Sequence, residues 1–220
     1  YKKIKVDDEK WIVSQECAKK LEFFGKEIVI EGDIKGKDLI GKFVKAPHTE
    51  QEIPIFEAEF VESGMGTGLV MSVPAHAPKD YQALMDLKLK NHELASKIEP
   101  VPIIVTEGYG EIPAKDVCEK LGVTDQIDTK LEKATEELYL KEYTNGKLNE
   151  KCGDFVNEKV EFGRNKVKDW LESKNQLETF PTLLNAPIRC RCGAECVVKI
   201  LNNQWFLNYG DEEWKKIARS

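Results

Sequence analysis

The sequence predicts an α/β fold in which short strands and surrounding helices form a compact core. Strand-like segments at 27–34, 39–46, 53–61 and 69–73 are separated by glycine and proline residues of the kind that form turns. The composition shifts after Thr106, and three cysteines cluster near the C-terminal end. We therefore expect an α/β core at 1–106, a helical insertion packed on it at 107–178, and a cysteine-containing hairpin with a return segment at 179–220.

The core is expected to begin with an amphipathic helix. Between Glu9 and Phe23, apolar residues recur at a roughly helical spacing, at Trp11, Ile12, Ala18 and Leu21. The strand-like segments follow this helix. Pro78 then begins a second helix that runs to about Lys90, since proline is tolerated in the first helical turn. A short, fully buried strand is expected at 101–106.

Helices dominate the predicted insertion. The first spans 113–121, with Pro113 at its start and Gly122 just past its end, an arrangement typical of helix boundaries. The second spans 129–143 and the third spans 163–174.

The C-terminal part is expected to form a small cysteine knuckle on a hairpin. Strand-like residues 197–201 and 204–208 are joined by a turn at 202–203. Zinc normally takes four ligands in a closed structural site, so three clustered cysteines are a weak zinc signal, and three reduced thiols are the alternative. The candidate zinc ligands are Cys190, Cys192 and Cys196.

Bulk composition limits the class of protein. The 220 residues include 33% charged residues, and the formal net charge is −6, which disfavours a broad nucleic-acid binder without excluding a pocket for a single-stranded 3′ end. The sequence contains neither a secretory signal nor an apolar run long enough to span a membrane. The scattered cysteines Cys17, Cys118 and Cys152 are expected to be buried free thiols, which fits a reducing cytoplasm. Because the chain starts at Tyr1, it is expected to be an excised segment.

Residues 64–81, with the sequence GMGTGLVMSVPAHAPKDY, are the most informative stretch. The glycine spacing does not match the dinucleotide-binding fingerprint, because strand-like residues rather than a helix follow Gly68. The alternatives are a flexible turn before a core strand and a turn that lets a ligand approach the backbone. No GxSxG nucleophile elbow occurs, and the three histidines form no metal-ligand cluster.

Two polar residues in this stretch are candidates for function. Asp80 falls in the first turn of the helix that Pro78 begins, where a carboxylate either complements the helix dipole or pairs with a substrate ammonium group. His76 precedes the helix, and a lone histidine in this position is more often structural than catalytic. Taken alone, these residues predict a pocket with an anion but no particular reaction.

The run GTGLVMSVPAHAPKDY resembles the core motif of leucyl-tRNA synthetase editing domains of the archaeal and eukaryotic cytosolic type. The downstream NQWFLNYGDEEWKKIA resembles the segment where that enzyme's chain returns to its synthetic body. The resemblance covers essentially the whole chain. It implies a barrel-like sheet of short strands and post-transfer editing, in which the ester of norvalyl-, isoleucyl- or methionyl-tRNA(Leu) is hydrolysed.

The resemblance also implies roles for particular residues. Asp80 matches the aspartate that holds the substrate α-ammonium group, and His76 is expected in the pocket wall. The amino-acid side chain is expected to contact Met71, Ser72 and Val73, and the terminal adenosine is expected beside Gly66, Thr67 and Gly68. The family's threonine-rich motif is expected to lie before Tyr1.

The expected partners are the aminoacylated 3′ end of tRNA(Leu) and the remainder of the synthetase, with no membrane involved. The resemblance implies no cofactor for editing, and ATP only in the synthetic domain. Two alternatives stay open. One is a noncatalytic module that binds an aminoacyl-tRNA 3′ end or a protein, and the other is a zinc-ribbon interaction module.

Overall fold

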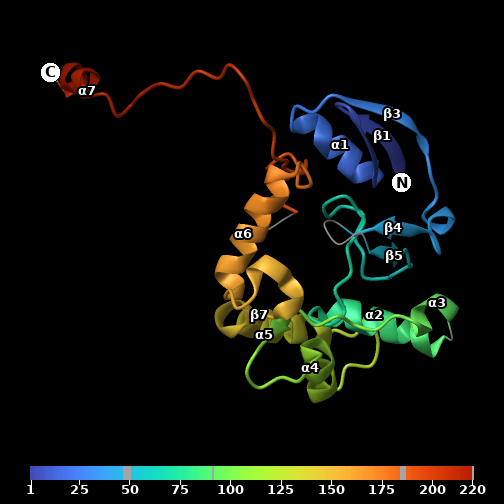
Figure 1. Ribbon diagram of the computed structural model, residues 1–220. Coiled ribbons are helices and arrows are strands. Elements are labelled where there is room, and N and C mark those ends of the chain that lie inside the picture. Colours follow the sequence, from blue (N-terminus) through green and yellow to red (C-terminus); the bar gives the residue numbers. More distant parts are fainter. Residues whose placement is uncertain (47–50, 91, 184–186, 220) are drawn as a thin grey trace.

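The computed structural model describes residues 1–46, 51–90, 92–183 and 187–219. Figure 1 shows an N-terminal sheet with one helix, a small hairpin next to it, a group of helices, and a C-terminal arm that leaves this body. The described residues therefore fold as a mixed α/β chain, as expected. They form one three-stranded and two two-stranded sheets, and these do not close into the expected barrel.

The three-stranded sheet has the order β2-β1-β3 and is antiparallel throughout. Its strands are β1 (Lys2–Val6), β2 (Glu9–Val13) and β3 (Ile28–Asp33). Helix α1 (Gln15–Phe23) covers one face and forms a core with the sheet. The buried members of this core are Ile4, Val6, Val13, Cys17, Ala18 and Leu21.

The predicted helix at 9–23 is correct only from Gln15 onward. Ser14 caps α1, because its Oγ accepts a hydrogen bond from the Cys17 N–H at 2.9 Å. Residues before this cap pair with β1 instead, with Trp11 opposite Ile4. The pairing gives these residues backbone partners in β1, and Val13 at the end of the strand is buried.

The next predicted strands are much shorter than expected. After η1 (Gly36–Asp38), strand β4 (Phe43–Lys45) pairs with β5 (Glu52–Pro54). The predicted strand at 69–73 is wrong, because the Val73 N–H donates to the Asp80 carboxylate rather than to a neighbouring strand. Its apolar side chains are partly exposed instead of buried in a sheet.

The helices of this region follow the prediction closely, but the expected fully buried strand at 101–106 is wrong, because only Ile104 and Val105 form a strand and Val105 is 63% exposed. Helix α2 (Pro78–Leu89) leads to α3 (Glu93–Ser96) and to β6 (Ile104–Val105), which pairs with β7 (Lys147–Leu148). The remaining elements are α4 (Pro113–Leu121), α5 (Lys130–Asn145), η2 (Glu150–Phe155) and α6 (Val160–Ser173). Tyr81 of α2 packs against the core between α4 and α5, so α2 is held by the predicted insertion. The division at residue 106 stays a prediction.

The predicted strands at 197–201 and 204–208 are wrong, whereas the cysteines do lie in a tight hairpin, in which Arg189 and Glu195 form an isolated antiparallel bridge. Residues 197–211 contain no strand, and helix α7 (Glu212–Arg219) stands at the end of the arm, away from the other helices (Figure 1). The arm contacts the body through the Ile200 N–H, which donates to the Phe23 carbonyl at 3.0 Å. Its large apolar side chains, such as Trp205 at 96% exposure, find no sheet to pack on. Among the described residues, no helix is long and apolar enough to cross a membrane.

Candidate functional site

Asp80 lies in the first turn of α2, with Pro78 at the start of the helix as predicted. Its side chain points back along the chain, since Oδ2 accepts a hydrogen bond from the Val73 N–H at 2.6 Å. The Val73 carbonyl in turn accepts from the N–H groups of His76 and Ala77, both at 3.0 Å. The carboxylate therefore fixes the loop that carries Met71, Ser72 and Val73 to the start of the helix.

The environment of Asp80 does not fully stabilise its charge. Only 6% of the residue is exposed, and burial raises the pKa of its carboxyl group. Hydrogen bonds from the Val73 backbone and the Ser72 side chain lower this pKa, but burial is the larger effect. A carboxylate in this state gains stability from a bound cation. Both roles expected from the sequence, complementing the helix dipole and pairing with a substrate ammonium group, stay predictions.

His76 is buried between α2, α5 and β6, where both ring nitrogens are engaged. Its Nδ1 lies 2.6 Å from Oε1 of Glu142, and its Nε2 accepts from the Ile103 N–H at 2.9 Å and the Ile104 N–H at 3.3 Å. The ring is therefore the neutral tautomer with its proton on Nδ1, which it donates to Glu142. Neither nitrogen is available to a substrate, so the geometry favours the structural role weighed from the sequence over a place in the pocket wall.

Sequence reasoning missed Glu142. The residue is 4% exposed and continues the buried face of α5 that Leu131, Ala134 and Leu138 form. A carboxylate on this otherwise apolar stripe signals a buried partner, because a lone buried charge is costly. The sequence therefore indicates that Glu142 has a buried partner, but it does not indicate that this partner is His76, 66 residues earlier in the chain.

The glycine turn at 64–68 is attached to the N-terminal sheet. The Thr67 carbonyl accepts from the Ser14 N–H at 2.7 Å, and the Gly68 carbonyl accepts from the Tyr1 hydroxyl at 3.0 Å. Gly66 and Gly68 both have positive φ, at 54° and 74°. The turn thus depends on glycine at two positions. No contact in the described residues joins it directly to Asp80, so the structure anchors the two halves of the motif separately.

Replacing Gly68 by alanine is expected to destabilise the protein more than the same change at Gly66. A Cβ at Gly68 would lie 2.6 Å from the Ser14 Cβ, whereas none of its surroundings crowd a Cβ at Gly66. The left-handed backbone costs about 1 kcal/mol at either position, and the clash adds roughly 1–3 kcal/mol at Gly68 alone. Urea unfolding of the two variants measures the difference. Equal losses of stability would show that the turn shifts freely away from Ser14.

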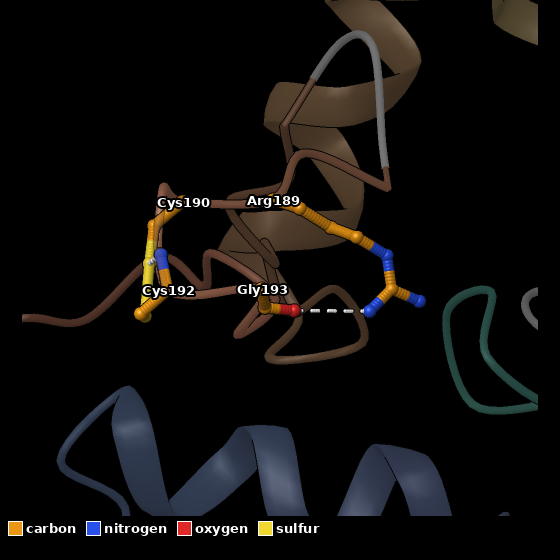
Figure 2. Close-up of a disulfide and its surroundings, with 4 residues drawn as sticks. All are labelled: Arg189, Cys190, Cys192 and Gly193. Carbon is orange, nitrogen blue, oxygen red and sulfur yellow. Dashed lines mark hydrogen bonds between the residues drawn. A yellow bond between two sulfur atoms is a disulfide. The ribbon is translucent and has the colours of Figure 1, made fainter.

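The predicted zinc ligands are not arranged as a metal site. Cys190 and Cys192 form a disulfide, as Figure 2 shows, and Cys196 is a free cysteine. The tight turn is closed by the Cys190 N–H donating to the Ala194 carbonyl and by Arg189 Nη1 donating to the Gly193 carbonyl. Disulfide sulfurs offer no thiolate, and no three metal-binding side chains converge in the described part of the chain. Zinc stays a prediction for the reduced protein, testable by metal analysis.

Comparison with known proteins shows which family the chain resembles. The family described as "Leucyl-tRNA synthetase, editing domain" matches residues 25–101, which include the glycine turn and Asp80. The chain is 47% identical over 213 residues to a leucine–tRNA ligase of Methanococcus maripaludis, and 43% identical over 209 residues to that of Methanocaldococcus jannaschii. Each match covers 94% of this chain, which spans 21% and 22% of the length of these relatives.

Solved structures share the fold. The crystal structure of GlLeuRS-CP1 has a TM-score of 0.69 at 28% identity and covers 83% of this chain and 75% of its own. The cytosolic leucyl-tRNA synthetase editing domain of P. knowlesi has a TM-score of 0.70 at 21% identity, over 77% of this chain and 63% of its own. Fold and motif together define an editing domain of an aminoacyl-tRNA synthetase. The chain belongs to the leucyl-tRNA synthetase editing-domain family.

Proposed function

We propose that this chain hydrolyses the ester bond of mischarged tRNA(Leu), as the post-transfer editing part of a leucine–tRNA ligase. The observation that carries this proposal is the buried Asp80 carboxylate, whose pKa burial raises, directly behind a loop with partly exposed Met71 and Val73. An aminoacyl ester carries an α-ammonium group next to an apolar side chain. The Asp80 carboxylate and the neighbouring apolar loop match these two features. Family membership supplies the reaction, because the curated relatives are leucine–tRNA ligases.

The roles proposed for the individual residues are those that the family resemblance implies. Asp80 holds the α-ammonium group by a charge-assisted hydrogen bond, and Met71, Ser72 and Val73 contact the amino-acid side chain. Gly66, Thr67 and Gly68 lie beside the terminal adenosine, which can approach the backbone closely because the glycines have no side chain. A positioned water, together with the substrate hydroxyls, carries out the hydrolysis. The reaction requires no metal, and ATP belongs to the synthetic part of the ligase.

A separate editing step has a physical reason. One missing or displaced methyl group changes binding by only about 1–3 kcal/mol, so a single pocket cannot reject every analogue of leucine. A second pocket multiplies the discrimination. Norvaline, isoleucine and methionine are the expected errors, and the reducing cytoplasm, where tRNA is charged, is the expected location.

The test is deacylation of isoleucyl-tRNA(Leu) and leucyl-tRNA(Leu) by the polypeptide that carries this chain. We expect the isoleucyl ester to be hydrolysed much faster than the leucyl ester, measured as release of labelled amino acid against a no-enzyme control. Binding of the charged tRNA without hydrolysis would instead support the noncatalytic 3′-end module. Equal hydrolysis of both esters would contradict an editing role.

A further inference from the structure

An open groove of about 630 Å³ lies where β1 meets the segment that follows β3. It is distinct from Asp80 and its loop, none of which lines it. Four of the residues that line it are lysines from three separate parts of the chain. They are Lys2, Lys3, Lys35 and Lys42.

The groove is basic although the chain as a whole carries a net charge of −6. Two aspartates also line it, but Asp33 is paired with Lys2, whose Nζ lies 2.5 Å from Oδ1 and lowers the pKa of the carboxyl group. Asp38 is the other. Lys3, Lys35 and Lys42 are exposed and make no ion pair with any described residue, so three uncompensated ammonium groups face one carboxylate.

The groove leads directly to the glycine turn. Tyr1 lines the groove, and its hydroxyl donates to the Gly68 carbonyl at 3.0 Å. The same ring lies against Gly36, next to the groove residue Lys35, where an added Cβ would lie 3.1 Å from the ring. Gln15 lines the groove as well, next to Ser14, whose N–H donates to Thr67. Tyr1 and Gln15 thus connect the groove to residues 67–68 of the glycine turn.

We propose that this lysine groove binds the phosphodiester backbone of the single-stranded 3′ end of an acceptor RNA and directs its terminal nucleotide to the glycine turn. The inference rests on the proposed function, since it names the path by which that substrate arrives. Single-stranded RNA carries one negative charge per nucleotide, and lysines that track the backbone bind it without reading sequence. Binding limited to a few phosphates is compatible with the acidic surface elsewhere.

The experiment compares two triple variants of the polypeptide that carries this chain. The groove variant combines Lys3→Gln, Lys35→Gln and Lys42→Gln. The control combines Lys90→Gln, Lys133→Gln and Lys174→Gln, which removes the same charge from exposed lysines outside the groove. Fluorescence anisotropy measures binding of an acceptor-stem minihelix of tRNA(Leu) with an unacylated 3′ end, over a series of salt concentrations.

The groove variant is expected to bind at least about tenfold more weakly than the control, with a log–log salt slope reduced by roughly 2, at about 0.7 per lost contact on a single strand. In deacylation its KM should rise while kcat stays within about twofold of the control. Equal affinities and slopes for the two variants, or no binding of the minihelix by the unmodified protein, would overturn the inference.

The two proposals can fail independently. If the groove variant hydrolyses isoleucyl-tRNA(Leu) at the same rate as the control variant, the editing function stands and the groove has no part in it. Groove-dependent binding by a protein that hydrolyses no ester supports the groove and contradicts the editing reaction.

Discussion

Replacing Asp80 by asparagine is expected to slow deacylation strongly while making the folded protein more stable at neutral pH. The asparagine side chain oxygen can still accept the hydrogen bond from the Val73 N–H, so the loop stays in place. The charge that holds the substrate ammonium group is lost. A hydrogen bond to a charged group contributes about 1.5–3 kcal/mol, so the rate of hydrolysis should fall roughly 10- to 150-fold. Single-turnover deacylation of isoleucyl-tRNA(Leu) measures the loss.

Asp86→Asn provides the matched control. Asp86 lies on the same helix, and its carboxylate accepts from the Gln126 N–H at 3.0 Å and from the Gln126 side chain at 3.2 Å. Its role is structural, so this change should lower stability without abolishing hydrolysis. Hydrolysis by the Asp80 variant at the unmodified rate would remove Asp80 from the reaction.

The stability of the Asp80→Asn variant has a definite pH dependence. Because burial raises the pKa of Asp80 in the folded state, the folded protein binds more protons than the unfolded chain between the ordinary and the raised pKa. Asp80 therefore lowers the stability of the unmodified protein as pH rises through this window. Asparagine removes this effect. Its melting temperature should exceed that of the unmodified protein at pH 7 and approach it below the ordinary pKa of aspartate, and a lower value at both pH values would contradict the argument.

His76→Ala is expected to destabilise the fold strongly. The change leaves the buried Glu142 carboxylate without its partner and removes the acceptor for the Ile103 and Ile104 N–H groups. Leaving a buried hydrogen-bonding group without its partner costs about 1–3 kcal/mol, and more when that group is charged, as Glu142 is when it accepts from the neutral ring. Urea unfolding should show a reduced midpoint, because α5, β6 and the start of α2 lose their shared contact.

His92→Ala is the control for this prediction, because it also removes an imidazole but from the cap of a short helix. His92 caps the short helix α3 by accepting from the Ala95 N–H at 3.4 Å, and loss of such a cap costs about 1 kcal/mol. A His76 variant that keeps its stability but loses hydrolysis would restore His76 to the pocket wall, as the family resemblance implies.

The helices could be predicted because their boundaries are encoded locally. Pro78 and Pro113 stand in the first turns of α2 and α4, and Gly122 ends α4 with φ of 62°. The position of Asp80 at the start of α2 follows from the same signals. Its role as the ammonium anchor came from the motif and stays a prediction.

The strands and the buried polar contacts could not be predicted in the same way. Residues 69–73 are apolar enough for a strand, but Asp80 takes the Val73 N–H that a strand would need. His76 and Glu142 are far apart in sequence, so their pairing depends on how α5 packs on α2. The barrel was expected from the resemblance. The described residues instead form one three-stranded sheet and two two-stranded sheets.

The hydrogen bond between Asp80 and Val73 has a consequence for how selectivity can evolve. The group proposed to hold the ammonium also sets the position of the residues proposed to sense the amino-acid side chain. The proposed binding of the α-ammonium group, which all aminoacyl esters share, is therefore structurally coupled to the proposed recognition of the amino-acid side chain, which differs between them. Changes in substrate preference should arise at Met71 rather than at Asp80 or at Ser72, because the Ser72 side chain hydrogen-bonds the Asp80 carboxylate and the Met71 side chain is exposed.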